Sequence, residues 1–142
     1  MWNDAMLKQI LVGYDDSPAA QRALEFALKL AQGFGCQLQV VYAAVLPAGS
    51  PEATASLMAD STALRPGLSQ KVLERAAQAG VKAAWKVVPG SAGDVLLAEV
   101  RSGSFDHLVI GNSGRGTLAR WLLGSVMNEV VEHSQIPVTV VP

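Results

Sequence analysis

The chain has 142 residues, 50% of them apolar and 16% charged, a composition typical of one globular domain with a full core rather than of a disordered or fibrous protein. Its formal net charge of −1 and pI of about 6.1 leave no basic field to attract nucleic acid or an anionic membrane, so we expect neither partner. Cys36 is the single cysteine, which excludes an internal disulfide. Since the first residues carry no basic head before a long apolar segment, we expect no signal peptide or membrane span and a cytoplasmic protein.

The first predicted elements are a strand and an amphipathic helix. The apolar run at residues 10–12 predicts the strand. Ser17 followed by Pro18 is a typical helix start, and Gly33 and Gly35 can end the helix, so we predict it over residues 18–32. Polar residues spaced along it form one exposed face: Gln21, Arg22, Glu25, Lys29 and Gln32. The residues between them are expected to face inward: Ala20, Ala23, Leu24, Ala27, Leu28 and Ala31.

Further along the chain, apolar runs continue to alternate with amphipathic segments. Residues 38–45 form a nearly continuous apolar run, which suits a strand covered on both faces. The segment 47–67 is small, polar and rich in proline, and no element is predicted there. The remaining predicted elements are helices over 68–79, 92–101 and 124–134 and strands over 81–88, 105–110 and 137–141.

This alternation predicts the fold class. Parallel strands need crossover connections, and the five predicted strands have helices between them, so we expect an α/β domain over residues 1–142 with a doubly wound parallel sheet and helices on both faces. Ligands of such sheets bind outside the carboxyl ends of the strands, where the strand order reverses. Functional residues are therefore expected just after strands.

Two segments after predicted strands carry suitable residues. The first is Tyr14-Asp15-Asp16-Ser17, and the second is GNSGRGTLARWLLGS, which begins at Gly111 and ends at Ser125. A glycine after a strand permits a positive φ, and its missing Cβ lets an anion approach the backbone N–H groups. A helix that begins at the end of the second segment adds free N–H donors and the positive end of its dipole. Both segments would then contact one anionic ligand.

The second segment resembles a known nucleotide motif. It is neither the Gly-x-Gly-x-x-Gly fingerprint of dinucleotide-binding proteins nor a Walker loop. It resembles the Gly-x2-Gly-x9-Gly-[Ser/Thr] motif of ATP-binding members of the universal stress protein family, and all four positions match: Gly111, Gly114, Gly124 and Ser125. The resemblance extends to the first strand and helix, with Asp15 at the family's acidic position, to the strand LQVVYAAV and to the last third of the chain.

This resemblance implies a strand order of 3-2-1-4-5, which places both segments at one cleft. Carried over by position, Asp15 would hydrogen-bond the nucleoside, and Ala43 would line the adenine pocket. The second segment and the helix start would hold the ribose and phosphates through Gly111, Ser113, Gly114, Arg115, Gly124, Ser125 and Val126. The implied ligand is ATP, with magnesium or manganese as its cation where one is bound.

Several residues also have purely structural interpretations. The glycines can be plain turn residues, and Asp15 can cap the first helix, although Asp16 and Ser17 are better placed for that role. Arg115 can be a phosphate partner or a solvated charge. His107 and His133 are too isolated in the sequence for a metal site or a catalytic triad, and the tryptophans Trp2, Trp85 and Trp121 are more typical of packing than of cofactor stacking.

The functional hypothesis is an ATP-binding regulatory protein of the stress response. Since no dedicated catalytic base is found, we expect at most slow ATP hydrolysis rather than an enzyme. The alternative is a non-catalytic dimeric interaction module whose cleft is empty or holds another adenine compound. The last strand, from Ile136 to Val141, is apolar apart from Thr139 and has no edge lysine, so we expect a homodimer formed through this strand, as the resemblance also implies.

Overall fold

A parallel five-stranded sheet with the order β3-β2-β1-β4-β5 forms the centre of the protein. The computed structural model describes residues 7–44, 67–112 and 125–142. Every pair of neighbouring strands is parallel. The strands are β1 (Gln9–Gly13), β2 (Gln37–Ala44), β3 (Ala83–Pro89), β4 (His107–Gly111) and β5 (Val138–Val141). The predicted fold class and strand order are confirmed.

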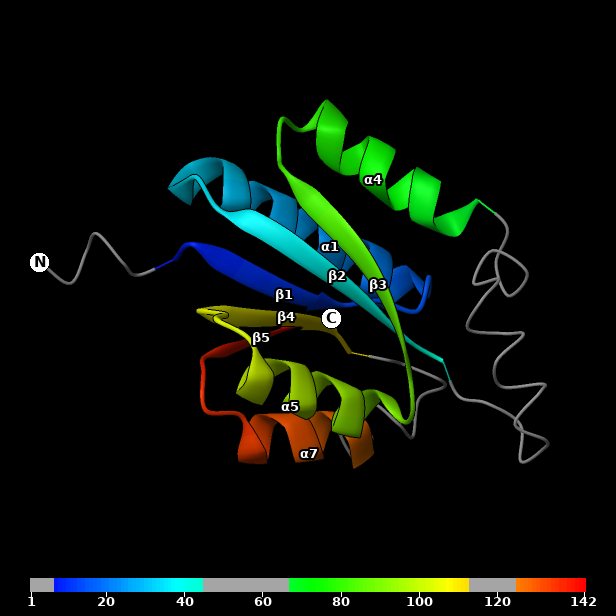
Figure 1. Ribbon diagram of the computed structural model, residues 1–142, viewed down its shortest axis with the longest axis vertical. Coiled ribbons are helices and arrows are strands. Elements are labelled where there is room, and N and C mark those ends of the chain that lie inside the picture. The colour runs from blue at the N-terminus through cyan, green and yellow to red at the C-terminus, as the bar shows by residue number, and fades with distance from the viewer. Residues whose placement is uncertain (1–6, 45–66, 113–124) are drawn as a thin grey trace, which may run out of the picture.

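Helices cover both faces of this sheet, as the doubly wound prediction requires. Helices α1 (Pro18–Phe34) and α4 (Leu68–Gln78) lie on one face, and α5 (Ala92–Ser102) and α7 (Ser125–His133) lie on the other (Figure 1). The core is accordingly divided into one apolar cluster on each side of the sheet. Most of the segment 47–67, for which no element was predicted, lies outside the described residues.

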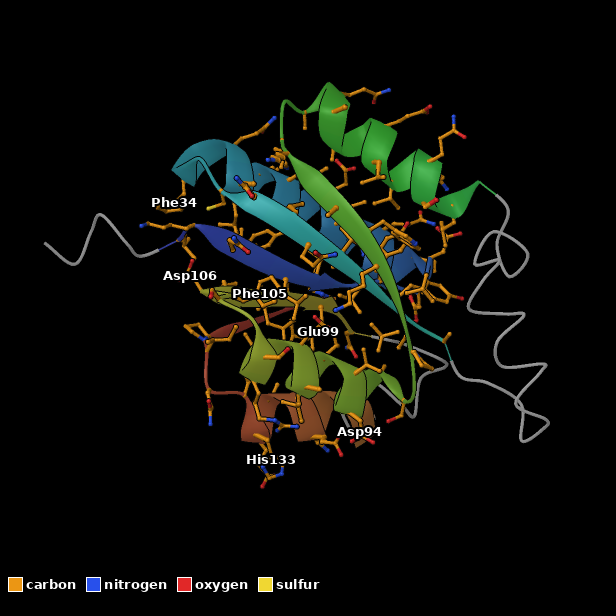
Figure 2. All side chains as sticks on the ribbon, in the orientation of Figure 1. Phe34, Asp94, Glu99, Phe105, Asp106 and His133 are labelled. Atoms are coloured by element: carbon orange, nitrogen blue, oxygen red, sulfur yellow. The ribbon has the colours of Figure 1, made fainter. Side chains whose placement is uncertain are left out.

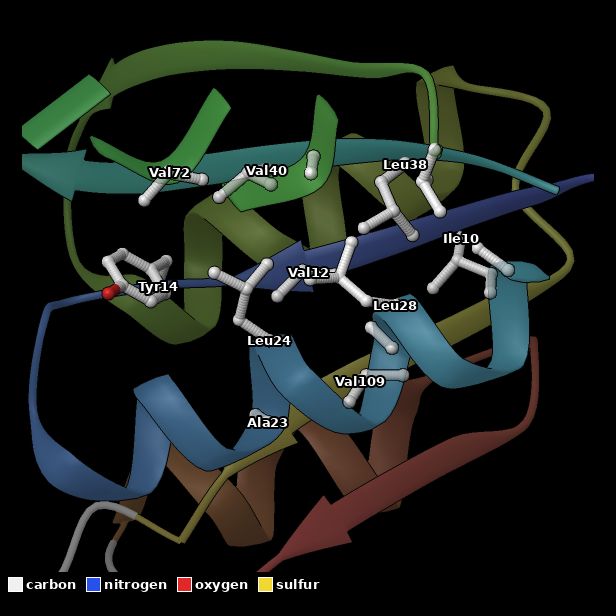
Figure 3. Close-up of a cluster of buried hydrophobic side chains, with 14 of the residues drawn as sticks. Ile10, Val12, Tyr14, Ala23, Leu24, Leu28, Leu38, Val40, Val72 and Val109 are labelled. Carbon is white, nitrogen blue, oxygen red and sulfur yellow. The ribbon is translucent and has the colours of Figure 1, made fainter. Parts of the chain in front are cut away.

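Strand β1 is the central strand, and its side chains alternate between the two clusters. Ile10 and Val12 pack with α1 residues such as Leu24 and Leu28 (Figure 3), whereas Leu11 packs on the α5 side. The side chains of Ile10, Leu11 and Val12 are fully buried. Burial of one such side chain stabilises a fold by about 1.5–3 kcal/mol, so the position of β1 between the two helical layers is strongly fixed.

Helix α1 begins where the sequence predicted and ends later. The Ser17 Oγ accepts the Ala20 N–H at 3.1 Å, which caps the first turn ahead of Pro18. The inward-facing residues predicted for this helix are all buried. Gly33 lies within the last turn, and Gly35, with φ of 71°, is the left-handed residue that ends the helix after Phe34. The predicted end at residue 32 is therefore two residues short.

The other strand boundaries shift by one or two residues for local reasons. Gly80 is left-handed with φ of 71°, and the Val81 N–H bonds back to the Ala76 carbonyl oxygen, so Val81 closes α4 instead of starting β3. Further along the chain, β4 includes Gly111, which was expected just past the strand. This last shift matters for the site, because Gly111 is part of the sheet.

Candidate functional site

A cleft lies at the carboxyl ends of β1, β2 and β4, beside the first turns of α1 and α5. It is open to solvent at its mouth and has a cavity volume of about 100 Å³. Its lining comes from these five elements and from the turn after β1: Gly13, Tyr14, Asp15, Ser17, Ala20, Val41, Ala43, Ala92, Leu96, Ile110 and Gly111. Since β1 and β4 are neighbours and the chain winds outward from them in opposite directions, the cleft lies at the point where the strand order reverses.

The cleft has apolar walls and a few polar groups at its rim. Val41, Leu96 and Ile110 are buried side chains that form part of the walls, and alanines at positions 20, 43 and 92 leave space between them. Polar side chains in the lining come from Asp15 and Ser17 in the turn after β1. Apolar walls with convergent polar groups are typical of a site for a flat, partly apolar ligand.

Asp15 is exposed at this rim and does not cap the helix. Its Oδ1 accepts the Ser17 N–H at 3.0 Å, a local turn that fixes the carboxylate next to its own backbone. The cap is supplied by Ser17. Of the two explanations for Asp15, the capping role is therefore wrong, and within the described part of the chain its Oδ2 has no hydrogen-bond partner.

Asp16 precedes the cap and makes a separate set of side-chain contacts. It was considered as a helix cap, but its φ of 62° places it in the left-handed region before the cap. A non-glycine residue in that region costs of the order of 1–3 kcal/mol. Its Oδ1 accepts hydrogen bonds from the Tyr14 hydroxyl at 2.9 Å and from Gln21 Nε2 at 3.2 Å. The sequence offers a signal for this left-handed conformation. Aspartate stands directly before the N-cap serine, and it is one of the few residue types that tolerate a left-handed φ.

Gly111 lines the cleft, and the structure tests one of the two reasons predicted for a glycine there. Its φ is not in the left-handed region, in contrast to Gly90 in the turn before α5. A Cβ at position 111 would lie 2.5 Å from the Ala19 carbonyl carbon and oxygen. The prediction of a positive φ at Gly111 is therefore wrong. Its missing Cβ allows β4 to approach the backbone of α1, and the approach of an anion to this glycine stays a prediction.

The other predicted site residues are only partly covered by the structure. Ala43 lies in the cleft lining beside Asp15 and Gly111, so these three come together as expected. Ser125 and Val126 are the first residues of α7. The remaining predicted positions lie outside the described residues: Ser113, Gly114, Arg115 and Gly124. Ala92 and Leu96 were missed, because no sequence motif marks the face of a helix that lies against a cleft.

The two histidines lie away from the cleft. His107 begins β4, pairs in register with Ile10 and contacts the Thr139 Oγ1 through Nε2 at 2.6 Å. Partial burial lowers the pKa of His107. His133 is exposed in the last turn of α7 and points away from the sheet (Figure 2). Within residues 7–44, 67–112 and 125–142, no group of three or more His, Cys, Asp or Glu side chains could hold a metal ion.

Trp85 has a packing role, as predicted. Its ring lies 6.2 Å from that of Tyr14 in an edge-on arrangement and 5.9 Å from that of Tyr42. Trp2 and Trp121 lie outside the described residues.

In the part of the chain that the structure describes, no helix is long and apolar enough to span a membrane.

The fold and the cleft together define a class, the doubly wound α/β proteins with a ligand site at the strand-order reversal. Residues 6–142 match the model of the universal stress protein family, and the chain belongs to that family. The universal stress protein Rv1636 of Mycobacterium tuberculosis is 30% identical over 141 residues, which cover 94% of this chain and 95% of the relative.

Solved structures of similar proteins share the fold over almost their whole length. The universal stress protein UspA from Lactobacillus plantarum superposes with a TM-score of 0.79 at 23% identity, over 97% of this chain and 99% of that one. A universal stress protein in complex with cAMP gives a TM-score of 0.75 at 26% identity, over 96% and 98% of the two chains. A family protein from Arabidopsis thaliana with AMP bound gives 0.69 at 20% identity, over 94% and 90%.

Proposed function

We propose that the cleft binds an adenine nucleotide, ATP in the first place, and that the protein is a cytoplasmic, ATP-binding regulator of the stress response. The proposal rests on one observation. Apolar walls and the Asp15 carboxylate line the same cleft, at the point where the strand order reverses. Solved family members in complex with cAMP and AMP support an adenine nucleotide as the ligand class.

The lining residues fit the two parts of a nucleoside. The walls around Ala43, Val41 and Leu96 offer apolar contact to the faces of a purine ring. Asp15 has an oxygen that can accept hydrogen bonds from ribose hydroxyls. The phosphates would extend toward Gly111 and the glycine motif, where Gly114, Gly124 and Ser125 precede or begin α7. The N-terminus of that helix favours anions through its free N–H groups and dipole.

Hydrolysis is expected to be slow at most. Transfer of a phosphoryl group needs a positioned water, a base or an arginine, and usually magnesium. Among the described residues that line the cleft, Asp15 is the one ionisable carboxylate, and the proposal uses it for the nucleoside. Magnesium or manganese would be held mainly by the nucleotide phosphates. The bound nucleotide is therefore proposed to act as a signal rather than as a substrate.

Titration calorimetry with ATP and GTP tests the ligand. ATP should bind more tightly, because the walls are apolar and fit adenine, and equal affinities would contradict the proposal. Ala43→Leu should weaken ATP binding by filling the cleft, and Gly114→Val should abolish it by blocking the approach of phosphate. Ala84→Leu is the matched control, because Ala84 is exposed on the neighbouring strand β3.

The second candidate function is a dimeric interaction module with an empty cleft or another adenine compound. The position of β5 at the edge of the sheet favours the dimer, and both candidates share it. Native mass spectrometry of protein purified without added nucleotide separates them. A bound adenine nucleotide supports the regulator, whereas protein without ligand that also fails to bind ATP in the titration supports the interaction module.

A further inference from the structure

The turn between β1 and α1 places two consecutive aspartates in different surroundings. Asp15 is exposed in the lining of the nucleotide cleft. Asp16 is half-buried and faces the other side of the turn, toward α1 and α4, where it contacts Tyr14, Gln21 and Lys71. We propose that Asp16 is a positioning residue for nucleotide binding: its contacts with Tyr14 and Gln21 hold the turn in the conformation that presents Asp15 to the ligand. This inference rests on the proposed function.

The backbone of the turn shows what must be held. Asp16 is the one non-glycine residue with positive φ in the described part of the chain, with φ of 62°. L-residues disfavour this conformation, so an isolated turn would relax toward negative φ. Relaxation at position 16 would rotate the neighbouring peptide groups, including the Ser17 N–H that binds Asp15 Oδ1 at 3.0 Å. The geometry at Asp15 therefore depends on the conformation at Asp16.

Hydrogen bonds to Asp16 oppose that relaxation. The Tyr14 hydroxyl donates to Asp16 Oδ1 at 2.9 Å. Gln21 Nε2 lies 3.1 Å from the Asp16 carbonyl oxygen and 3.2 Å from Oδ1, so one amide binds both the backbone and the side chain of Asp16. Lys71 Nζ of α4 lies 3.8 Å from the same oxygen. These contacts connect the turn to both helices on this face of the sheet.

Tyr14 gives these contacts a rigid anchor. Its side chain is 5% exposed and closes one end of the buried cluster beneath α1 (Figure 3). The ring packs edge-on against Trp85, and the Tyr14 N–H bonds to the Val41 carbonyl oxygen at 3.0 Å. The hydroxyl is thus fixed by the core and by β2. The hydrogen bond from this hydroxyl to Asp16 therefore limits the motion of the exposed turn relative to the core.

Four variants test the proposal with ATP as the probe. Asp16→Ala removes the side-chain contacts, leaves the Gln21 bond to the backbone carbonyl oxygen and keeps the φ penalty. The Kd for ATP should therefore rise about tenfold or more, the effect of one lost hydrogen bond plus strain. Tyr14→Phe keeps the ring and should raise Kd by about threefold to tenfold. Asp16→Asn keeps an acceptor oxygen, and asparagine tolerates a left-handed φ, so its Kd for ATP should stay within about twofold of the wild-type value. Arg75→Gln is the control, since it breaks the ion pair with Glu25 between α1 and α4 without touching the turn.

A second measurement separates positioning from loss of stability and needs no ligand. Amide exchange of Ser17, followed by NMR, should be several times faster in Asp16→Ala, while exchange of Tyr14, which is bonded to β2, stays unchanged. In an Asp15→Ala background, Asp16→Ala should have no further effect on Kd, because the group that it positions is gone.

The two measurements distinguish failure of this inference from failure of the proposed function. If the wild type does not bind ATP, the proposed function fails, and the Ser17 exchange still decides whether Asp16 holds the turn. Unchanged Ser17 exchange in Asp16→Ala overturns the inference in either case. A loss of ATP affinity that is equally large with and without Asp15 also overturns it, because Asp16 would then act independently of Asp15.

Discussion

The backbone of Gly111 in β4 lies directly against the backbone of Ala19 in the first turn of α1. A Cβ built at position 111 would come within 2.5 Å of the Ala19 carbonyl oxygen and 2.7 Å of the Ala20 nitrogen. Backbone atoms cannot move aside as a flexible side chain can. The first position of the glycine motif therefore sets the distance between β4 and α1, and with it the width of the cleft that both elements line.

Gly111→Ala should destabilise the protein by about 1–3 kcal/mol or more, because the new methyl group must push α1 away from the sheet. Urea unfolding measures this loss. Gly33→Ala is the matched control, since nothing lies within 4 Å of a Cβ at that position and its φ is not left-handed. That control should be stabilised by about 0.5–1 kcal/mol, as expected for alanine replacing glycine in a helix. Equal stability of Gly111→Ala and wild type would contradict the packing role.

Asp15→Ala should weaken ATP binding by roughly tenfold to a hundredfold, the effect of losing a hydrogen bond to a charged group. The loss of stability should be small, because Asp15 is exposed and its described contact is the local bond to Ser17. Asp15→Asn keeps an acceptor for Ser17 and should bind ATP with intermediate affinity. Calorimetry gives the affinities, and ATP binding by Asp15→Ala as tight as wild type would remove Asp15 from the site.

Most of the fold was predictable because local and global signals agree. The apolar periodicity of α1, its serine cap and its C-terminal glycine all indicate one helix, and the structure has that helix. The alternation of strands and helices then leaves few allowed topologies. Errors are confined to element ends such as Val81, where a strand-like residue is used to close the preceding helix through its bond to Ala76.

The site was less predictable, because its residues depend on tertiary packing. Asp15 and Gly111 follow from the position of strand ends, and Ala43 was placed in the pocket by the family resemblance. The side-chain contacts of Asp16 include Gln21 in the first turn of α1 and Lys71 in α4, and the sequence does not place α4 relative to the turn. Gly111 is the first residue of the glycine motif, and packing against α1 also requires a residue without a Cβ there. The sequence alone cannot distinguish these two reasons for the glycine.

The stability of the protein should depend on pH through His107. Burial lowers its pKa below the usual value of 6.5, so at mildly acidic pH the unfolded chain binds a proton that the folded protein resists. The free energy of unfolding should therefore decrease as the pH falls from about 6.5, with no contribution from His107 at higher pH. Urea unfolding between about pH 8 and pH 5 measures this dependence.

His107→Gln should weaken that dependence while keeping a side chain that can hydrogen-bond to Thr139. The control is His133→Gln, because His133 is exposed in the last turn of α7. If His107→Gln and wild type lose stability equally on acidification, protonation of His107 is not the cause.

The edge strand β5 offers a surface for a second copy of the chain. The carbonyl oxygens of Pro137 and Val141 accept N–H groups of Leu108 and Asn112, so these residues direct their backbone toward β4. Because successive residues of a strand direct their backbone groups to opposite sides, Val138 and Val140 direct theirs to the open edge. Antiparallel pairing of two such edges about a two-fold axis would satisfy these groups in both copies.

We therefore expect a homodimer paired through β5, and Val140→Lys should shift it toward monomer by placing two like charges close together across the axis. Val140→Pro is a second variant, which removes the outward N–H and leaves the ladder to β4 intact, as proline does on the solvent side of an edge strand. Sedimentation equilibrium at micromolar concentration measures the assembly, and circular dichroism checks that both variants stay folded. A wild-type protein that is monomeric under these conditions, or folded variants as dimeric as wild type, would exclude β5 as the interface, because a dimer built on its edge requires those backbone groups.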